Sequence, residues 1–291
     1  MSEQKDVSNI VKLFRNGQDN SLYFNEVLAL FDPTTELFKN YNEKLKQAFT
    51  SAFIEGGASN EESLVRWNGI SKIVVDGLNE KTELKKIEEN LLYFYKVFLN
   101  PTRTQINQNA RAERCFNAVK EYLVGNTIVD YGCGKGLLGE KIQSDLGKNV
   151  LLVDNIDFNK SNLPMLKSDR DGKTNLSDLS VDTSIAYLVL HHMDNPLSGL
   201  KELSRITQSR IVLMEGWIED INCRYINQAI DWFFNRILLG VDMNVPLNFL
   251  SIEQWAELLE SVSFRVSKVD YVGPDEKLAP EHHVLIIAER I

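Results

Sequence analysis

The residues best placed for chemistry lie in one short segment, Asp130-Tyr-Gly-Cys-Gly-Lys-Gly136. An apolar run leads into Asp130, three glycines alternate from Gly132 to Gly136, and an amphipathic helix is expected to follow. Glycine allows positive φ angles and close approach of a ligand to the backbone, and the first turn of a helix offers unpaired N–H groups. The segment predicts a ligand-binding loop between a strand and a helix; a plain tight turn is the alternative.

A second acid, Asp154, ends the next apolar run, twenty residues after Gly134. A carboxylate at that place can accept hydrogen bonds from ribose hydroxyls, which favours a nucleoside ligand. The dinucleotide fingerprint G-x-G-x-x-G needs glycine where this chain has Leu137. Asp130 at the mouth of the loop suits a cationic amino group better than a pyrophosphate. These observations favour S-adenosylmethionine, with a nicotinamide oxidoreductase as the alternative.

All four histidines occur in two adjacent pairs, His191-His192 and His282-His283. Histidine is well tuned to remove a proton near neutral pH, so His192 is the preferred candidate base, and His191 and His283 are further catalytic candidates. A hydrogen-bonded structural role is the alternative. Because neighbouring residues of a strand point to opposite faces, we expect at most one of each pair to face a pocket. Glu215, at the end of a later strand, is a candidate to orient a base or bind an amine.

Joint metal binding by the histidines is not expected from the sequence. Adjacent histidines on strands make poor joint ligands, and no carboxylate or cysteine completes a recognisable ligand spacing. The three cysteines form no C-x-x-C pair, which favours a reducing, cytoplasmic environment. The predicted metal content is therefore none.

The elements that must position these residues change in character near Pro101. Before it, apolar residues recur at intervals of three and four, which predicts amphipathic helices. After it, short apolar runs alternate with helical stretches, which predicts β-α-β units and a mainly parallel sheet. The expected strands are 127–130, 150–153, 164–166, 184–190, 211–214, 264–272 and 284–288, the last two forming an antiparallel hairpin at the sheet edge.

The expected fold class is therefore α/β, a doubly wound, mainly parallel, seven-stranded Rossmann-like sheet with an all-helical N-terminal domain. We expect residues 1–100 to form that helical domain, as a lid, a dimer interface or both, and residues 101–291 to form the core. The segment 217–250 is long for a β-to-α connection and is expected to cover the carboxyl ends of the strands. Its candidate substrate contacts are Trp217, Arg224, Tyr225 and Asn248.

Composition narrows the range of partners. The 291 residues carry a net charge of −9 and no stripe of Lys or Arg, so no nucleic-acid partner is expected. No apolar run approaches the ~18 residues that span a bilayer. Enzymes that methylate adenine N6 carry an Asn/Asp-Pro-Pro-aromatic run after the fourth strand, and cytosine-C5 enzymes need a Pro-Cys pair; this sequence has neither.

These motifs together resemble those of the class I S-adenosylmethionine-dependent methyltransferases, in the ubiquinone/menaquinone-methyltransferase-like, small-molecule branch. The segment 130–136 resembles their first motif and Val150-Leu-Leu-Val-Asp154 their second. The segment 188–196, with its His-His and Asp-Asn-Pro, resembles the motif after the fourth strand, and 208–215 resembles the fifth strand. The resemblance covers about residues 104–291.

The resemblance implies a set of cofactor contacts. The methionine part would lie against Asp130, Gly132 and Gly134, and the ribose against Asp154. Asp169 and Asp171 both compete to pair with the adenine amino group, and the sequence leaves that choice open. The remaining candidate cofactor-binding residues are Tyr131, Cys133, Asn155, Val189, Leu190 and Arg111.

The functional hypothesis is transfer of a methyl group from S-adenosylmethionine to a small-molecule acceptor, with S-adenosylhomocysteine as product. We expect O-methylation ahead of N- or C-methylation, and an acceptor that is partly apolar or aromatic. The N-terminal helices are the candidate interface for a homodimer. The alternative from another class is a non-catalytic S-adenosylmethionine-binding partner or regulatory protein.

Overall fold

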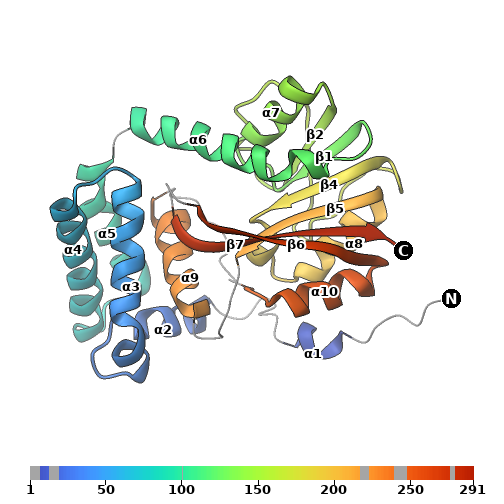
Figure 1. Cartoon of the computed structure of the whole chain (residues 1–291). Helices are drawn as coiled ribbons and strands as arrows, with labels where there is room; N and C mark the ends of the chain where they lie inside the picture. The colour runs from blue at the N-terminus through green and yellow to red at the C-terminus, as the bar shows by residue number, and fades with distance from the viewer. Residues whose placement is uncertain (1–6, 13–19, 100, 217–222, 239–247, 276–278) are drawn as a thin grey trace.

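A seven-stranded sheet forms the centre of the molecule in the computed structural model, which describes residues 7–12, 20–99, 101–216, 223–238, 248–275 and 279–291. The strand order is β3-β2-β1-β4-β5-β7-β6. All pairings are parallel except those of β7, which runs antiparallel between β5 and β6 (Figure 1). The strands are β1 Thr127–Tyr131, β2 Asn149–Asp154, β3 Met165–Lys167, β4 Val181–Tyr187, β5 Thr207–Gly216, β6 Phe264–Asp275 and β7 Ala279–Arg290. The α/β fold class and the terminal hairpin are confirmed.

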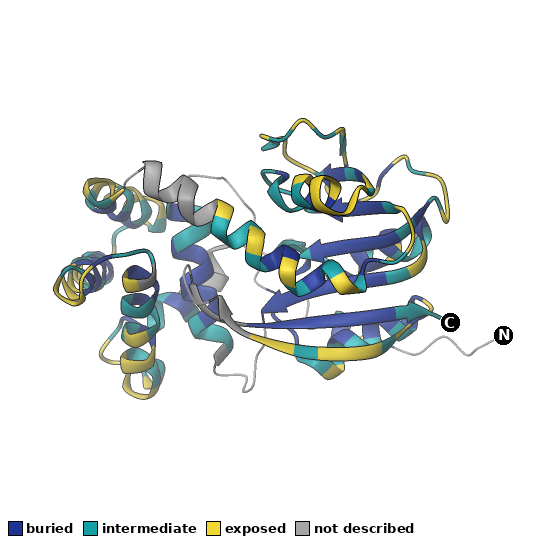
Figure 2. Cartoon of the chain, turned by 45° about the horizontal axis from the view of Figure 1, so that its top comes forward, coloured by how far each residue is buried: buried dark blue, intermediate teal, exposed yellow. Residues whose placement is uncertain are grey.

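Two apolar clusters cover the faces of the sheet, because alternate residues of each buried strand point to opposite sides. Helices α6 (Pro101–Val119) and α7 (Leu137–Leu146) contribute to one cluster. Helices α8 (Pro196–Ile206) and α10 (Ile252–Ser261) contribute to the other. Figure 2 shows the strands as mostly buried, whereas part of the edge strand β6 is exposed. The sheet is thus covered on both faces, and its carboxyl edge is the place where loops meet.

The N-terminal region contains only helices among its described residues. These are α1 Ser8–Val11, α2 Asn20–Ala29, α3 Glu36–Glu55, α4 Asn60–Asn79 and α5 Leu84–Tyr95, followed by a 3-10 turn over Lys96–Phe98. Helix α3 begins where the Thr35 hydroxyl accepts a hydrogen bond from Phe38 N, and α4 where Ser59 accepts one from Glu62 N. None of the described helices is long and apolar enough to cross a membrane.

Helix α9 (Cys223–Asp231) and the π-helix that continues it (η4, Trp232–Leu238) lie between these helices and the sheet (Figure 1). Phe233 is fully buried and its ring lies 5.3 Å from the rings of both Phe49 and Tyr95. The carboxylate of Glu88 on α5 accepts hydrogen bonds from Trp232 Nε1 and from Arg236 Nε. Helices α2 to α5 and the α9–η4 segment therefore share one hydrophobic core, whereas Ile10 of α1 is buried in the cluster on the sheet.

Strand β4 ends earlier than the sequence indicates. The expected strand 184–190 stops at Tyr187, and Leu188 adopts a φ of +50°. A 3-10 turn then runs over Leu190–His192, so neither His191 nor His192 lies on a strand. The expectation that the two side chains point to opposite faces is wrong, since it assumed strand geometry.

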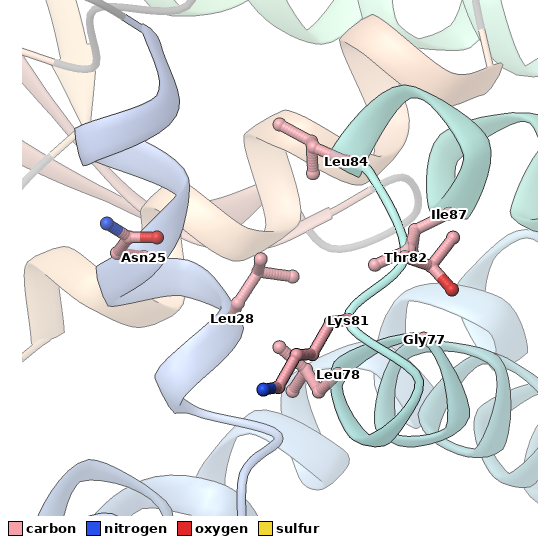
Figure 3. Close-up of a pocket in the computed structure, with 8 residues that line it drawn as sticks. All are labelled: Asn25, Leu28, Gly77, Leu78, Lys81, Thr82, Leu84 and Ile87. Atoms are coloured by element: carbon pink, nitrogen blue, oxygen red, sulfur yellow. The ribbon is translucent and has the colours of Figure 1, made fainter.

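A pocket of about 300 Å³ lies among the N-terminal helices, between α2 and the α4–α5 turn (Figure 3). It is lined by Asn25, Leu28, Gly77, Leu78, Lys81, Thr82, Leu84 and Ile87. Its one ionisable lining residue is Lys81, and it contains no acid or histidine. Catalytic chemistry is therefore to be sought at the carboxyl edge of the sheet.

The shared aromatic core leads to a stability prediction. We expect Phe233→Ala to lower the free energy of unfolding by about 3–5 kcal/mol, because a fully buried aromatic ring is replaced by a cavity. The measurement is urea denaturation followed by circular dichroism and tryptophan fluorescence. The control is Tyr93→Ala on α5. Tyr93 is 80% exposed, so its replacement should change the free energy of unfolding by less than about 0.5 kcal/mol. Equal stabilities for the two variants would contradict the shared core.

Candidate functional site

The glycine loop connects β1 to α7 at the carboxyl edge of the sheet. Gly132, Gly134 and Gly136 have φ angles of +73°, +51° and +73°, which only glycine adopts readily. A Cβ atom on Gly132 would lie 2.2 Å from Val189, so glycine is required there for close packing as well. A Cβ atom on Gly134 would meet nothing within 4 Å. The backbone at Gly134 is therefore open on the side where a ligand can approach.

Asp130 anchors the helix that follows the loop. Its side chain is buried, and its Oδ2 accepts a hydrogen bond of 3.1 Å from the backbone N–H of Gly139 in the first turn of α7. Gly136 is the N-cap residue of α7 and has no side chain that could accept a hydrogen bond from the first turn. Asp130, at the end of β1, accepts one instead. Burial raises the pKa of Asp130 to about 7, and the nearby charge of Asp154 acts in the same direction.

Asp154 ends β2 beside the loop and is half-buried. Its Oδ2 accepts a 2.8 Å hydrogen bond from Gly134 N, and its Oδ1 accepts one from Ile156 N. Burial raises the pKa of this carboxyl too, against the effect of these hydrogen bonds. Two acids thus lie within reach of the same loop, in an environment that disfavours their charged forms. A ligand with a cationic group and hydroxyl donors would satisfy both, so these residues fit a nucleoside that carries an amino group.

The other loop candidates have structural contacts that define their places. The Tyr131 hydroxyl donates to Gly172 O at 2.7 Å, and burial raises the pKa of that phenol. Cys133 donates its backbone N–H to Val153 O, and burial raises the pKa of its thiol, so it is not a ready nucleophile. Asn155 is exposed next to Asp154.

The two acids that compete for the adenine contact both lie in the turn after β3, and both are exposed. Asp169 is held in that turn, because its Oδ1 accepts a hydrogen bond from Lys173 N at 2.8 Å. Asp171 stands at the exposed tip of the turn. The choice between them stays open.

Beyond β4, Val189 packs against Gly132, and Leu190 is fully buried. The guanidinium of Arg111 on α6 lies 5.7 Å from the centre of the Tyr187 ring, at the end of β4. The segment after β4 is thus in direct contact with the glycine loop.

The 3-10 turn that carries His191 and His192, hereafter the histidine turn, is attached to β5 by a buried carboxylate. Glu215 Oε2 lies 2.5 Å from His191 Nδ1, and its Oε1 accepts a hydrogen bond from Leu190 N at 2.9 Å. Both side chains are buried, at 3% and 1% exposure. The Phe249 ring stacks on the His191 ring at a centroid distance of 4.7 Å. His191 is therefore fixed in position and orientation.

His192 lies beside His191, with 4.1 Å between the two ring centres. Its Nδ1 is 3.6 Å from Asp231 Oδ2 on α9. Burial lowers the pKa of His192 well below its usual value, and the charge of His191 acts in the same direction. The neutral ring can accept a proton from a group hydrogen-bonded to it, and the Asp231 carboxylate, at 3.6 Å, lies close to the ring without a hydrogen bond to Nδ1.

Asp231 was not predicted from the sequence, although a spacing could have revealed it. Arg224, Asn227, Gln228 and Asp231 recur at intervals of three and four, which places them on one face of α9. Asn227, Gln228 and Asp231 are buried, so this polar face is turned inward. The amide nitrogen of Asn227 comes within 3.8 Å of where a Cβ on Gly216 would be. The polar face of α9 thus lies over the end of β5.

The structure places the predicted substrate-contact residues in different surroundings. Arg224 lies on the polar face of α9, whereas Tyr225 packs against the aromatic core shared with the N-terminal helices. Asn248 is buried: its backbone N–H donates to His191 O at 2.9 Å and its side chain to Met193 O at 2.7 Å. Asn248 therefore stabilises the histidine turn. Trp217 lies outside the described residues.

His283 is buried on β7, directly opposite Gly216 of β5. Glu215 is paired with Val284, and alternation along the strands places His283 on the opposite face of the sheet from Glu215. On the side of Gly216 that His283 shares, a Cβ atom would meet Phe249 and the amide nitrogen of Asn227. The base role of His283 stays a prediction.

Comparison with known proteins agrees with this geometry. Residues 129–213 match the protein family described as Methyltransferase domain. The match runs from β1 to β5 and covers the segment that carries the glycine loop, Asp154 and the histidine turn. No curated protein matches the sequence.

Several solved structures are similar in fold. A chain of the complex between the Haloferax volcanii Trm112 methyltransferase activator and a putative methyltransferase is 15% identical, with a TM-score of 0.49, covering 67% of this chain and 95% of that one. A SAM-dependent methyltransferase from Aquifex aeolicus is 18% identical, with a TM-score of 0.45 and coverages of 69% and 98%. Geranyl diphosphate methyltransferase in complex with SAM is 17% identical, with a TM-score of 0.48 and coverages of 63% and 85%.

The loop geometry predicts different costs for two alanine substitutions. Both Gly132→Ala and Gly134→Ala place a side chain at positive φ, at a cost of about 1–2 kcal/mol. Gly132→Ala also forces its Cβ into Val189, which should cost a further ~1–3 kcal/mol. Chemical denaturation of the two variants measures the difference. Equal destabilisation would show that Val189 does not pack against the loop as described.

Proposed function

We propose that the protein is an S-adenosylmethionine-dependent methyltransferase that acts on a small molecule, with a hydroxyl as the favoured acceptor group. The observation that carries the proposal is the glycine loop with two acids that burial makes hard to ionise. Asp130 would hold the cationic amino group, the open backbone at Gly134 the methionine part, and Asp154 the ribose hydroxyls. The methyltransferase domain match over the same residues supports this assignment.

The bound cofactor supplies an activated methyl group on a positively charged sulfur. The chain must then align an acceptor and keep water away, and orientation alone can contribute ~7–11 kcal/mol toward such a barrier. Val189, in contact with Gly132, connects the loop to the histidine turn. His192, with Asp231 beside it, is the candidate group to take the proton of an acceptor hydroxyl. This pair supports O-methylation.

Two features support a small-molecule acceptor. The polar face of α9 is buried over the end of β5, in a layer between the sheet and the N-terminal helices (Figure 1). The net charge of −9 opposes binding to nucleic acid. Phe249 beside His191 supplies an aromatic surface, and the α9 face supplies hydrogen-bonding groups. An acceptor with both an apolar part and polar substituents fits these surroundings best.

The test is calorimetric binding of S-adenosylhomocysteine followed by methyl transfer to a panel of hydroxylated, amino and carbon acceptors. We expect binding, and turnover with a hydroxylated compound. His192→Ala should slow turnover while leaving affinity for S-adenosylhomocysteine unchanged. Binding without turnover on any acceptor would favour the non-catalytic partner, and stabilisation by NADH alone would overturn the proposal.

Loss of the β2 acid should weaken cofactor binding. Asp154→Ala removes charged hydrogen bonds to the ribose, which should cost about 1–3 kcal/mol of binding free energy for S-adenosylhomocysteine. The control is Asp145→Ala, an exposed acid at the end of α7 that pairs with Lys141. Unchanged affinity in Asp154→Ala would contradict the ribose contact.

The raised pKa of Asp130 makes binding dependent on pH. Near pH 7 the buried carboxyl of the free protein is partly protonated, since its pKa is about 7. A bound ammonium group favours the charged form and lowers that pKa, so binding should release up to about half a proton at pH 7. Affinity for S-adenosylhomocysteine should therefore rise from pH 5 to pH 8. Calorimetry in buffers of different ionisation enthalpy measures the proton release, and Asp130→Asn should abolish it.

The same shift affects stability without ligand. The folded pKa of Asp130 lies above its unfolded value, so the folded state binds more protons between about pH 4 and pH 7. This carboxyl therefore makes the free protein less stable as pH rises through that window. Asp130→Asn should remove this contribution, and a pH profile of stability identical to that of the wild type would contradict it.

A further inference from the structure

The histidine turn and the end of α9 bring together three side chains of types that commonly serve as metal ligands. A ring nitrogen of His191, a ring nitrogen of His192 and a carboxylate oxygen of Asp231 all lie within 4.8 Å of one another. His192 Nδ1 and Asp231 Oδ2 are 3.6 Å apart. A tetrahedral ion with bonds of about 2.0–2.1 Å needs neighbouring ligand atoms about 3.3 Å apart. Small side-chain rotations would bring the three atoms to that separation.

The second observation concerns the nitrogen of His192 itself. Nδ1 is buried and makes no hydrogen bond within the part of the chain that the structure describes. A buried polar atom without a partner costs free energy, and such atoms in native proteins usually have a role. The nearest carboxylate oxygen lies beyond hydrogen-bond distance, at 3.6 Å. A cation between the nitrogen and the carboxylate would satisfy both atoms.

Glu215 gives His191 the surroundings of a metal ligand. Its carboxylate lies 2.5 Å from His191 Nδ1, which leaves Nε2 as the nitrogen that can bind a cation. Histidines that bind metals commonly use their other nitrogen in this way, and the carboxylate fixes the ring and strengthens it as a ligand. The stacked ring of Phe249 holds the plane of the imidazole.

We propose that His191, His192 and Asp231 bind one divalent transition-metal ion of the zinc class. Two imidazoles and one carboxylate suit Zn²⁺ and its neighbours, whereas Mg²⁺ and Ca²⁺ prefer oxygen ligands. Three protein ligands leave a position open, as in catalytic rather than structural sites. An ion there would act as a Lewis acid on an oxygen of a bound small molecule.

The sequence predicts no metal site, because it predicts strand geometry for the histidines. In the structure, His191 and His192 lie in a 3-10 turn instead. Joint binding was not expected for two histidines on a strand, and no carboxylate had the right spacing. The 3-10 turn places both rings together, and α9 brings Asp231 from a distant part of the chain. The site goes beyond the proposed function, because binding of the ion requires neither cofactor nor acceptor. His192 can act as a base only in the metal-free protein, since a ring bound to the ion cannot also take a proton.

The experiment uses the full chain without an affinity tag, treated with a chelator that is then removed. Zn²⁺ binding is measured by calorimetry and Co²⁺ binding by visible absorption. We expect one ion per chain. Asp231→Asn and His192→Gln should each weaken binding more than tenfold, and Glu215→Gln, which alters only the outer partner, about ten- to a hundredfold. The matched controls are His283→Gln, a buried histidine on β7 outside the group of three ligands, and Asp194→Asn, an acid just after the turn; both should bind as the wild type does.

Three results would overturn the proposal. In the first, the wild type binds less than one ion per chain. In the second, Asp231→Asn and His192→Gln bind the ion as tightly as the wild type. In the third, the control variants lose as much affinity for the ion as these two variants do. If a variant does not unfold cooperatively, histidine NMR of the wild type decides. Zn²⁺ must then shift the signals of His191 and His192, and a shift confined to other histidines contradicts the site. Binding of S-adenosylhomocysteine to the same samples reports separately on the proposed function.

Discussion

The burial of acidic side chains at one edge of the sheet is the constraint on which the rest of the structure depends. Asp130, Asp154, Glu215 and Asp231 come from four different elements and meet at the carboxyl edge. A carboxylate removed from water must be matched by donors or cations. Among the donors that the chain supplies to these acids are Gly139 N, Gly134 N, Ile156 N, Leu190 N, the ring of His191 and the side-chain amide of Asn235. Burial still raises the pKa values of Asp130 and Asp154, so the glycine-loop part of this edge favours positively charged ligands.

Helix α9 connects this edge to the N-terminal helices. Its apolar residues, continued by Phe233, lie in the aromatic core of α3 and α5, and its polar residues lie over β5. Because one short helix serves both sides, the packing of the N-terminal helices contributes to the position of Asp231. The helices thus act on the site as a support whose packing sets where α9 lies.

Much of the fold and of the glycine loop could be predicted from the sequence, and the reason is local. Apolar runs, alternating glycines and an acid at the end of a strand depend on neighbouring residues, and the strands, the loop and the terminal hairpin were confirmed. The histidine cluster could not be predicted in the same way. It depends on the positive φ of Leu188, which a non-glycine residue adopts only when tertiary packing requires it. It also depends on the approach of Asp231, which lies far along the chain from His192; only the spacing of polar residues along α9 indicated an inward polar face.

The two faces of α9 are chemically independent although they belong to one helix. Substitutions at 224, 227 or 228 would alter the lining above β5 without changing the aromatic contacts behind it, since those contacts come from the other side. A chain built in this way can change the polar groups above β5 through few exchanges while the aromatic core behind them keeps its composition. In evolutionary terms, α9 is the element through which relatives of this protein would be expected to diverge.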